Sequence, residues 1–326
     1  MTLRLGTRGS ALALAQSTLV AEAIEAALGE PVELVEIVTD GDRSTAPVAS
    51  LGVGVFVSAL RDALQAKDID IAVHSYKDLP TAAVEGLTIA AIPAREDPRD
   101  ALVSRTGSSL MELPERSRIG TGAARRVAQL RALGRGLECV PLRGNVDTRL
   151  RRVAEGDLDA VVLAAAGVRR LGRADAITEL LDPEVLLPAP AQGALAVECR
   201  TGDHSLVEQL ACLNDEHSRA AVAAERSFLA TLEAGCSAPV AALAVVVQAT
   251  SSDRRDRSTV DSSTVDSSTV DGAVWLHLRG AVFEPGGAHA VRRDATGPLS
   301  DATGLGTRLA AQLLDEGADL LLGETA

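Results

Sequence analysis

The chain has 326 residues, which is enough for two or three domains of roughly 100–200 residues each. Its 46% hydrophobic and 24% charged residues are typical of a globular protein, and a net charge of −13 argues against nucleic acid as a partner. The four cysteines show no zinc-ligand or disulfide spacing, and neither a signal peptide nor an apolar stretch of about 18 residues is found. We therefore expect a cytoplasmic protein with reduced thiols, no metal and no membrane partner.

Short apolar runs alternate with helical patterns through the first two thirds of the chain. This alternation predicts right-handed crossovers and mostly parallel sheets covered on both faces. Ser10 stands at the N-cap position of the first helix. The predicted strands cover 3–5, 32–38, 68–75, 87–93, 100–104, 118–121, 137–143, 158–167 and 194–200, and the predicted helices cover 11–28, 56–65, 124–133, 146–155, 205–213 and 215–233.

Two proline-marked stretches, 92–100 and 186–193, bracket the middle of the chain. If the strand over 194–200 returns to the first sheet, the chain crosses between two domains twice. Such a double crossover makes a hinge beside a cleft, where ligands commonly bind. We expect an α/β protein with domain 1 over 1–93 and 194–213, domain 2 over 99–187, and domain 3 over 216–326.

The last part of the chain has a different pattern, with strands over 240–249 and 273–283 and a final helix over 301–315. This order predicts a small α+β domain. Between its strands lies the low-complexity block 251–272, which includes three tandem copies of S-T-V-D. A repeat rich in Ser and Asp cannot bury a core, so we interpret it as an exposed hairpin insertion.

Arginines gather at three places where a strand end meets a helix start, over 6–13, 120–126 and 142–152. A helix N-terminus offers unpaired N–H groups and the positive end of the helix dipole. The middle of the chain, 95–175, holds 16 arginines and no lysine against 11 acidic residues, a local excess of positive charge in an acidic protein. With arginines also at 169–170, these junctions predict a polyanionic ligand. Solvated helix faces with i,i+4 ion pairs explain Arg151, Arg152 and Arg173 better.

Two further segments carry reactive groups. The segment 72–81 ends an apolar strand with His74, Ser75, Lys77 and Asp78, although taken alone it is more typical of a polar turn capped by Asp78. Cys236 lies in the turn sequence GCSAP, which predicts an exposed, reactive thiol, although a lone cysteine is weak support for a nucleophile. The cysteines in apolar patterns are expected to be small core residues; they are Cys139, Cys199 and Cys212.

Six ordered motifs between residues 3 and 240 resemble those of the porphobilinogen deaminases, also called hydroxymethylbilane synthases. They are TRGSALA, DIAVHSYKDLP, REDPRDALVS, LRGNVDTRL, AQGALAVECR and LEAGCSAP. The resemblance implies two periplasmic-binding-protein-like domains, a third small domain, and a monomeric transferase of tetrapyrrole biosynthesis. Its reaction joins four porphobilinogens head to tail into hydroxymethylbilane and releases ammonia. The resemblance also implies a dipyrromethane cofactor, bound through a thioether to Cys236.

Matching the motifs assigns roles to individual residues. Asp78 would face the pyrrole N–H groups and stabilise the cationic azafulvene, with Lys77 beside it as a second catalytic group. The cofactor would be held by Ser75, Asp78, Arg125 and Arg126, and substrate carboxylates by Arg8, Ser10, Arg143, Arg149, Arg170 and Gln192. Phe56 and the glycine-containing 42–54 loop would form a lid.

The chain departs from the family pattern at Asp40, Val53 and Ala123, so we expect its lid contacts and hydroxyl donors to differ. Two rival functions remain open. The same cleft could serve a non-catalytic polycarboxylate-binding module, or a paralogue that binds pyrroles with weak turnover. The absence of a signal-peptide pattern speaks against periplasmic transport, and Cys236 together with Asp78 favours catalysis.

Overall fold

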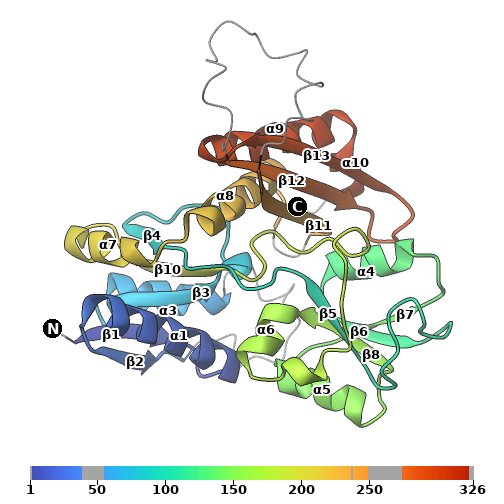
Figure 1. Cartoon of the computed structure of the whole chain (residues 1–326), viewed down its shortest axis with the longest axis horizontal. Coiled ribbons are helices and arrows are strands. Elements are labelled where there is room, and N and C mark those ends of the chain that lie inside the picture. Colours follow the sequence, from blue (N-terminus) through green and yellow to red (C-terminus); the bar gives the residue numbers. More distant parts are fainter. Residues whose placement is uncertain (1, 39–54, 236–237, 249–273, 323–326) are drawn as a thin grey trace, which may run out of the picture.

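A computed structural model describes residues 2–38, 55–235, 238–248 and 274–322 of the chain (Figure 1). Its strands are β1 (Leu3–Thr7), β2 (Val32–Glu36), β3 (Ile71–Ser75), β4 (Leu87–Ala91), β5 (Asp100–Ser104), β6 (Arg118–Thr121), β7 (Glu138–Pro141), β8 (Ala160–Ala164), β9 (Glu179–Leu180), β10 (Leu195–Arg200), β11 (Val240–Gln248), β12 (Val274–Phe283) and β13 (Ala290–Pro298). Its α-helices are α1 (Ala11–Leu28), α3 (Val55–Gln65), α4 (Ala124–Ala132), α5 (Val146–Ala154), α6 (Ala165–Arg170), α7 (His204–Leu210), α8 (Glu216–Thr231), α9 (Ala302–Asp315) and α10 (Ala318–Leu322). Figure 1 shows them in three parts, each built around one sheet.

The first sheet has the strand order β2-β1-β3-β10-β4, and helices cover both of its faces. On one face α1 and α7 pack through residues such as Ile24 and Leu210. On the other face α3 packs through Leu60 and Leu64. The Ser10 hydroxyl accepts a hydrogen bond from the Ala13 N–H at 3.3 Å and so caps α1, as the sequence predicts. The prediction that no apolar stretch of about 18 residues occurs is wrong for α1, whose 18 residues are long and apolar enough to cross a membrane by length and composition alone. In this fold α1 packs on the sheet.

The second sheet repeats this plan with the order β7-β6-β8-β5-β9. One core, which includes Leu130 of α4, lies on one face, and a second core with Leu150 of α5 and Val168 of α6 lies on the other. The strand predicted over 158–167 ends at Ala164, because α6 begins at the next residue. The alanine run that follows the valines is therefore helical and brings Arg169 and Arg170 to the end of α6.

The prediction of mostly parallel sheets is wrong for the strands that come from the hinge. Within each sheet two strand pairs are parallel, and β5 and β10 pair antiparallel with both neighbours. The register explains this: Leu195 at the start of β10 lies opposite Ser75 at the end of β3, and Asp100 at the start of β5 lies opposite Ala164 at the end of β8. Each strand that follows a hinge segment begins at the carboxyl edge of its sheet, so it runs antiparallel to its neighbours.

The chain crosses between the two sheets twice, through residues 92–99 and 181–194. Both crossings contact α8. Glu225 on α8 is fully buried and accepts two hydrogen bonds from the Arg95 guanidinium, at 2.6 and 2.9 Å, and one from the Ala191 N–H at 2.5 Å. A buried carboxylate with this set of donors ties both hinge segments to one helix.

The third part is an antiparallel sheet, β11-β12-β13, packed against α8 and α9. Its core includes Phe228, Leu276 and Leu309, all fully buried. The strand β13, the short β9 and the helix α10 are absent from the sequence predictions. The low-complexity block 251–272 lies outside the described residues, but it connects Gln248 and Val274, which are register partners of one hairpin.

The cysteines outside Cys236 differ in their surroundings. Cys199 is fully buried in β10, as expected for a small core residue, and Cys139 is half-buried. The prediction is wrong for Cys212, which is exposed. It lies in the short 3₁₀ turn Ala211–Leu213 after α7, whose buried face is formed by Leu206 and Leu210 instead.

Candidate functional site

The turn that follows β3 carries two of the predicted catalytic residues. Tyr76–Asp78 form one turn of 3₁₀-helix at the carboxyl edge of the first sheet. Asp78 is exposed, whereas Lys77 is half-buried and donates a hydrogen bond to Gln192 Oε1 at 3.2 Å. Burial lowers the pKa of Lys77 to about 8, opposed mainly by the charge of Asp78. Nearby Arg126 and Arg125 lower the pKa further, which places them in the same field.

The carboxyl edge of the second sheet holds a buried ion-pair cluster. Asp100, the first residue of β5, is fully buried and pairs with Arg125 and Arg126 of α4, each at 2.7 Å. Arg125 also donates to the Leu187 carbonyl at 2.7 Å, and Arg126 to the Val162 carbonyl at 3.0 Å. Burial acts to raise the pKa of Asp100, but the two guanidinium groups hold it well below its usual range.

Gln192 connects this cluster to the turn after β3. Its amide nitrogen donates to Asp100 Oδ1 at 2.8 Å and to the Pro98 carbonyl at 2.7 Å, while its oxygen accepts from Lys77. Gly193 follows with a φ of 89°, and a Cβ there would collide with the main chain at Glu96. This close approach explains the glycine and fixes Gln192 between the two sheets.

The burial of Arg125 and Arg126 was not foreseen, because Asp100 was not singled out in the sequence. Both arginines are about 5% exposed, and much of their hydrogen-bonding capacity is used by protein groups. A usable signal was present: an aspartate at the head of the apolar strand DALVS needs a buried partner. Their contact with a cofactor stays a prediction.

The other predicted carboxylate ligands lie near strand ends and in or beside helices, and Arg170 is the last residue of α6. Arg8 follows β1 and is half-buried, and Arg143 precedes α5 and is exposed. Arg149 of α5 donates to the Gly144 carbonyl at 2.8 Å, and Arg170 donates to the Gly193 carbonyl at 2.6 Å. The Ser75 hydroxyl is hydrogen-bonded to the side-chain amide of Gln16 on α1, at 3.0–3.1 Å.

Positive charge exceeds negative charge around Asp78. Burial lowers the pKa of Arg149, Arg126 and Arg143 lower it further, and Asp78 opposes the shift. These four groups therefore share one field, to which Lys77 also belongs. A half-buried excess of cations is costly without an anionic ligand, so the site suits a molecule with several carboxylates.

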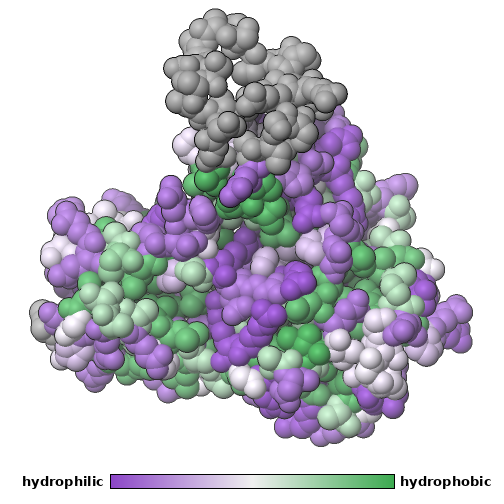
Figure 2. Space-filling view, viewed as in Figure 1, coloured by the Kyte–Doolittle hydropathy of each residue, from purple (hydrophilic) through white to green (hydrophobic). Residues whose placement is uncertain are grey.

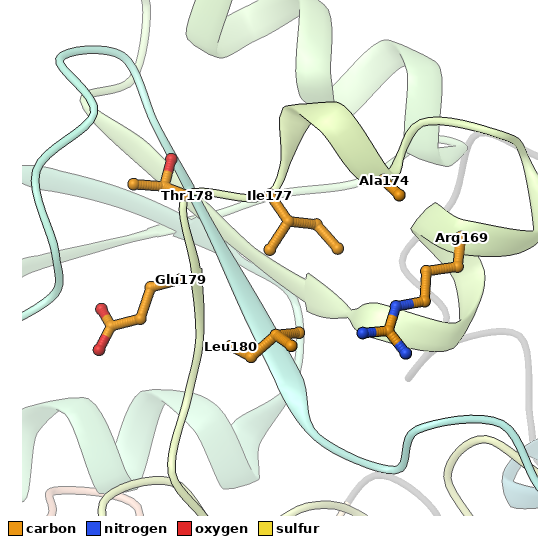
Figure 3. A pocket seen from close by; sticks show the side chains of 6 residues that line it. All are labelled: Arg169, Ala174, Ile177, Thr178, Glu179 and Leu180. Atoms are coloured by element: carbon orange, nitrogen blue, oxygen red, sulfur yellow. The ribbon is translucent and has the colours of Figure 1, made fainter.

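Space alone does not mark this site. A cavity of about 340 Å³ lies beside β9 and is lined by Arg169, Ala174, Ile177, Thr178, Glu179 and Leu180 (Figure 3). Of these, only Arg169 is among the arginines from which the sequence predicts a polyanionic ligand, and it is paired with Glu96 at 2.9 Å. By contrast, Figure 2 shows hydrophilic residues gathered at the centre of one face, between the three parts of the molecule.

Three expectations lie outside the described residues: Cys236, the 42–54 loop, and the departures at Asp40 and Val53. Phe56 is the second residue of α3. Arg151 makes the expected i,i+4 pair, with Glu155 at 3.8 Å. Arg152 and Arg173 are also in exposed ion pairs, but with Asp157 at 3.4 Å and Asp147 at 3.2 Å, which are not i,i+4 partners.

The chain is similar to known proteins over nearly its whole length. The family model for the "porphobilinogen deaminase, dipyromethane cofactor binding domain" matches residues 3–208, and that for the "porphobilinogen deaminase, C-terminal domain" matches residues 220–315. The porphobilinogen deaminase of Mycobacterium bovis BCG is 54% identical over 320 residues, covering 98% of each chain. That of Nocardia farcinica is 55% identical over 324 residues, covering 99% of this chain and 89% of its own.

Solved structures match the chain at low sequence identity. The methionine-binding protein MetQ gives a TM-score of 0.40 at 14% identity and covers 65% of this chain and 89% of its own. A periplasmic substrate-binding protein of an ABC transporter from Coxiella burnetii gives 0.43 at 13% identity, covering 65% and 91%.

Proposed function

The chain belongs to the porphobilinogen deaminase family, and we propose that the turn after β3 and the cation cluster around it form its catalytic centre. It is a transferase of tetrapyrrole biosynthesis. It joins four porphobilinogens head to tail, and each ring loses one ammonia as its aminomethyl carbon bonds to the growing chain. One water molecule then releases the four-ring product as hydroxymethylbilane. The two family models cover the predicted domains 1 and 2 and most of domain 3. The alternative of a non-catalytic binding module receives no support.

One observation carries the placement of the centre. Asp78 is an exposed carboxylate at the carboxyl edge of the first sheet, in the shared field of Lys77, Arg126, Arg143 and Arg149. A substrate with an acetate and a propionate on every ring needs several cations beside one group that tolerates a positive reacting centre. These residues offer that combination.

The same residues fit the family's dipyrromethane cofactor. The carboxylates of that cofactor would pair with the cationic side chains around Asp78. When bound, the dipyrromethane supplies the pyrrole end to which the first new ring is joined. We propose that Cys236 anchors it through a thioether, and that Arg143, Arg149 and Arg170 hold carboxylates. Arg125 and Arg126, already paired with Asp100, would add charge from below the surface rather than wrap around a ligand.

The chain's own side chains have three roles in the reaction. Asp78 accepts hydrogen bonds from pyrrole N–H groups and stabilises positive charge that develops on the incoming ring. Lys77, whose pKa of about 8 keeps it mostly protonated at neutral pH, binds a carboxylate of the substrate. Gln192 holds Lys77 in place from the hinge.

Replacing Asp78 by Asn tests this centre. Purified protein is mixed with porphobilinogen, and substrate loss and ammonia release are followed together. We expect one ammonia per porphobilinogen from the natural chain, and a rate lowered about 10²–10⁴-fold in Asp78→Asn. Glu85→Gln, an exposed change in the loop that follows, is the matched control and should leave the rate unchanged. Equal rates in both variants would remove Asp78 from the mechanism.

Three coarser expectations complete the proposal. We propose that the protein is cytoplasmic and acts as a monomer. We propose the domain division 1–93 with 194–213, 99–187 and 216–326, which agrees with one sheet in each unit. Size-exclusion chromatography with light scattering tests the monomer, and a second copy per particle would contradict it.

A further inference from the structure

Arg226 on α8 binds the main chain of the turn that carries Lys77 and Asp78. Its guanidinium donates to the carbonyls of Tyr76 at 3.2 Å, Leu79 at 3.0 Å and Pro80 at 2.6 Å. It also lies 4.3 Å from the centre of the Tyr76 ring, in cation–π contact. One side chain from the third part of the molecule thus binds the end of the proposed catalytic turn.

These carbonyls lie at the start of the turn and directly after it. The Tyr76 carbonyl also accepts from the Leu79 N–H at 3.2 Å, which closes the 3₁₀ turn, and Leu79 and Pro80 are the two residues that follow the turn. Cationic side chains at the carboxyl end of a helical turn satisfy such unpaired oxygens. Burial lowers the pKa of Arg226, so its charge is held here at a cost that the carbonyl contacts offset.

The helix that presents Arg226 is itself held firmly. The preceding residue, Glu225, binds Arg95 and the Ala191 N–H of the two hinge segments. Downstream, α8 ends at Thr231, and a short loop then leads to Cys236. The same helix therefore contacts the hinge, holds the Lys77–Asp78 turn and precedes the proposed attachment point of the cofactor.

We propose that Arg226 is a positioning residue for the reaction, which holds the Lys77–Asp78 turn in place at the carboxyl edge of the first sheet. This inference rests on the proposed catalytic role of Asp78. Without Arg226 the carbonyls of Leu79 and Pro80 lose this donor, the Tyr76 carbonyl keeps only the Leu79 N–H, and the turn can shift. Because a displacement of about 1 Å can cost a reaction on the order of 10²-fold, the effect appears in the chemical step.

A purely structural role for Arg226 predicts something different, and the chain offers a matched control. Arg219 lies on the same helix two turns earlier and so on the same face. It donates to the carbonyls of Ile89 and Ala90, each at 3.2 Å, and to Asn214 Oδ1 at 2.9 Å. Arg219 therefore docks α8 on the first part of the molecule without touching the catalytic turn.

The experiment compares Arg226→Gln, Arg226→Lys, Arg219→Gln and Asp78→Asn. The fraction of each protein that carries the cofactor is measured by intact mass, and kcat and KM are calculated for that fraction. Thermal unfolding is recorded in parallel. We expect Arg226→Gln to lower kcat by about 10- to 100-fold with KM nearly unchanged. Arg226→Lys should recover part of the loss, and Arg219→Gln should lose stability but keep kcat within about twofold.

A second readout separates position from stability. Free guanidinium ion at low millimolar concentration should restore part of the activity of Arg226→Ala, since it can occupy the vacated site between the carbonyls. It should do nothing for Arg219→Ala. If kcat falls equally in the Arg226 and Arg219 variants, or falls only in proportion to lost stability, Arg226 has no positioning role. If Asp78→Asn keeps full activity, the proposed function itself fails.

Discussion

The Lys77 ammonium donates to Gln192 Oε1 at 3.2 Å, and this bond joins the turn after β3 to the second hinge segment. Through Gln192 the turn is linked to Asp100 and hence to the arginine pair of α4. The Gln192 amide thus fixes the position of Lys77, after a strand of the first sheet, relative to the Asp100 cluster of the second sheet.

Replacing Gln192 by Leu should weaken both links. The Pro98 carbonyl and Lys77 would each lose a buried partner, which costs about 1–3 kcal/mol of unfolding free energy per unsatisfied group. We also expect KM for porphobilinogen to rise, because Lys77 is no longer oriented. Urea unfolding and steady-state kinetics measure the two effects. A variant with unchanged stability would show that the amide is not an essential link.

Lys77 should give stability a distinct alkaline pH dependence. Its pKa is about 8 in the folded chain and near 10.5 in the unfolded chain, so between these values the unfolded chain binds more protons. Stability should therefore increase as the pH rises from 8 to 10.5, relative to a Lys77→Met variant that lacks the group. Below pH 8 the difference between the two proteins should be constant. Unfolding at several pH values tests this, and parallel curves across the whole range would contradict the lowered pKa.

Asp100→Asn should strongly destabilise the protein. The change leaves Arg125 and Arg126 buried with no counter-charge, which typically costs about 3–5 kcal/mol. Asp157→Asn, which removes only an exposed pair with Arg152, should cost less than about 1 kcal/mol.

The lowered pKa of Asp100 also predicts how the stability of the protein changes at acid pH. The folded pKa lies well below the usual value of 3.8, so the stabilisation is complete above pH 4 and is lost as the pH falls further. Asp100→Asn should therefore flatten the acid side of the stability curve. An equal acid dependence in both proteins would mean that the pair with Arg125 and Arg126 does not hold the charge.

The local sequence pattern was enough to predict most helices and strands. Hydrophobic periodicity and capping residues depend only on residues that are close together in the sequence. The helix after Ser10 and the return of the strand near Leu195 were both predicted from such signals. The pairing direction of β5 and β10 was not, since it depends on where the hinge enters each sheet. The short β9 has too few residues to show a period.

The candidate site was predictable to the extent that its residues stand in motifs. Lys77, Asp78 and Gln192 were named from the sequence, and the structure brings Lys77 and Gln192 into contact. Asp100, Glu225 and Arg226 were missed, because each acts on groups far away along the chain. Glu225 and Arg226 stand in an alanine-rich helix whose polar residues look like a solvated face until its neighbours are known.

We propose that Cys236 carries a covalently attached dipyrromethane. Intact mass spectrometry of the purified protein tests it most directly, with Cys236→Ser and Cys212→Ser compared under the same conditions. The natural chain and Cys212→Ser should both be heavier than the sequence mass by one dipyrromethane and should colour with Ehrlich's reagent. Cys236→Ser should have the bare mass and stay colourless. A natural chain at its bare sequence mass, or an adduct that survives in Cys236→Ser, would contradict the account.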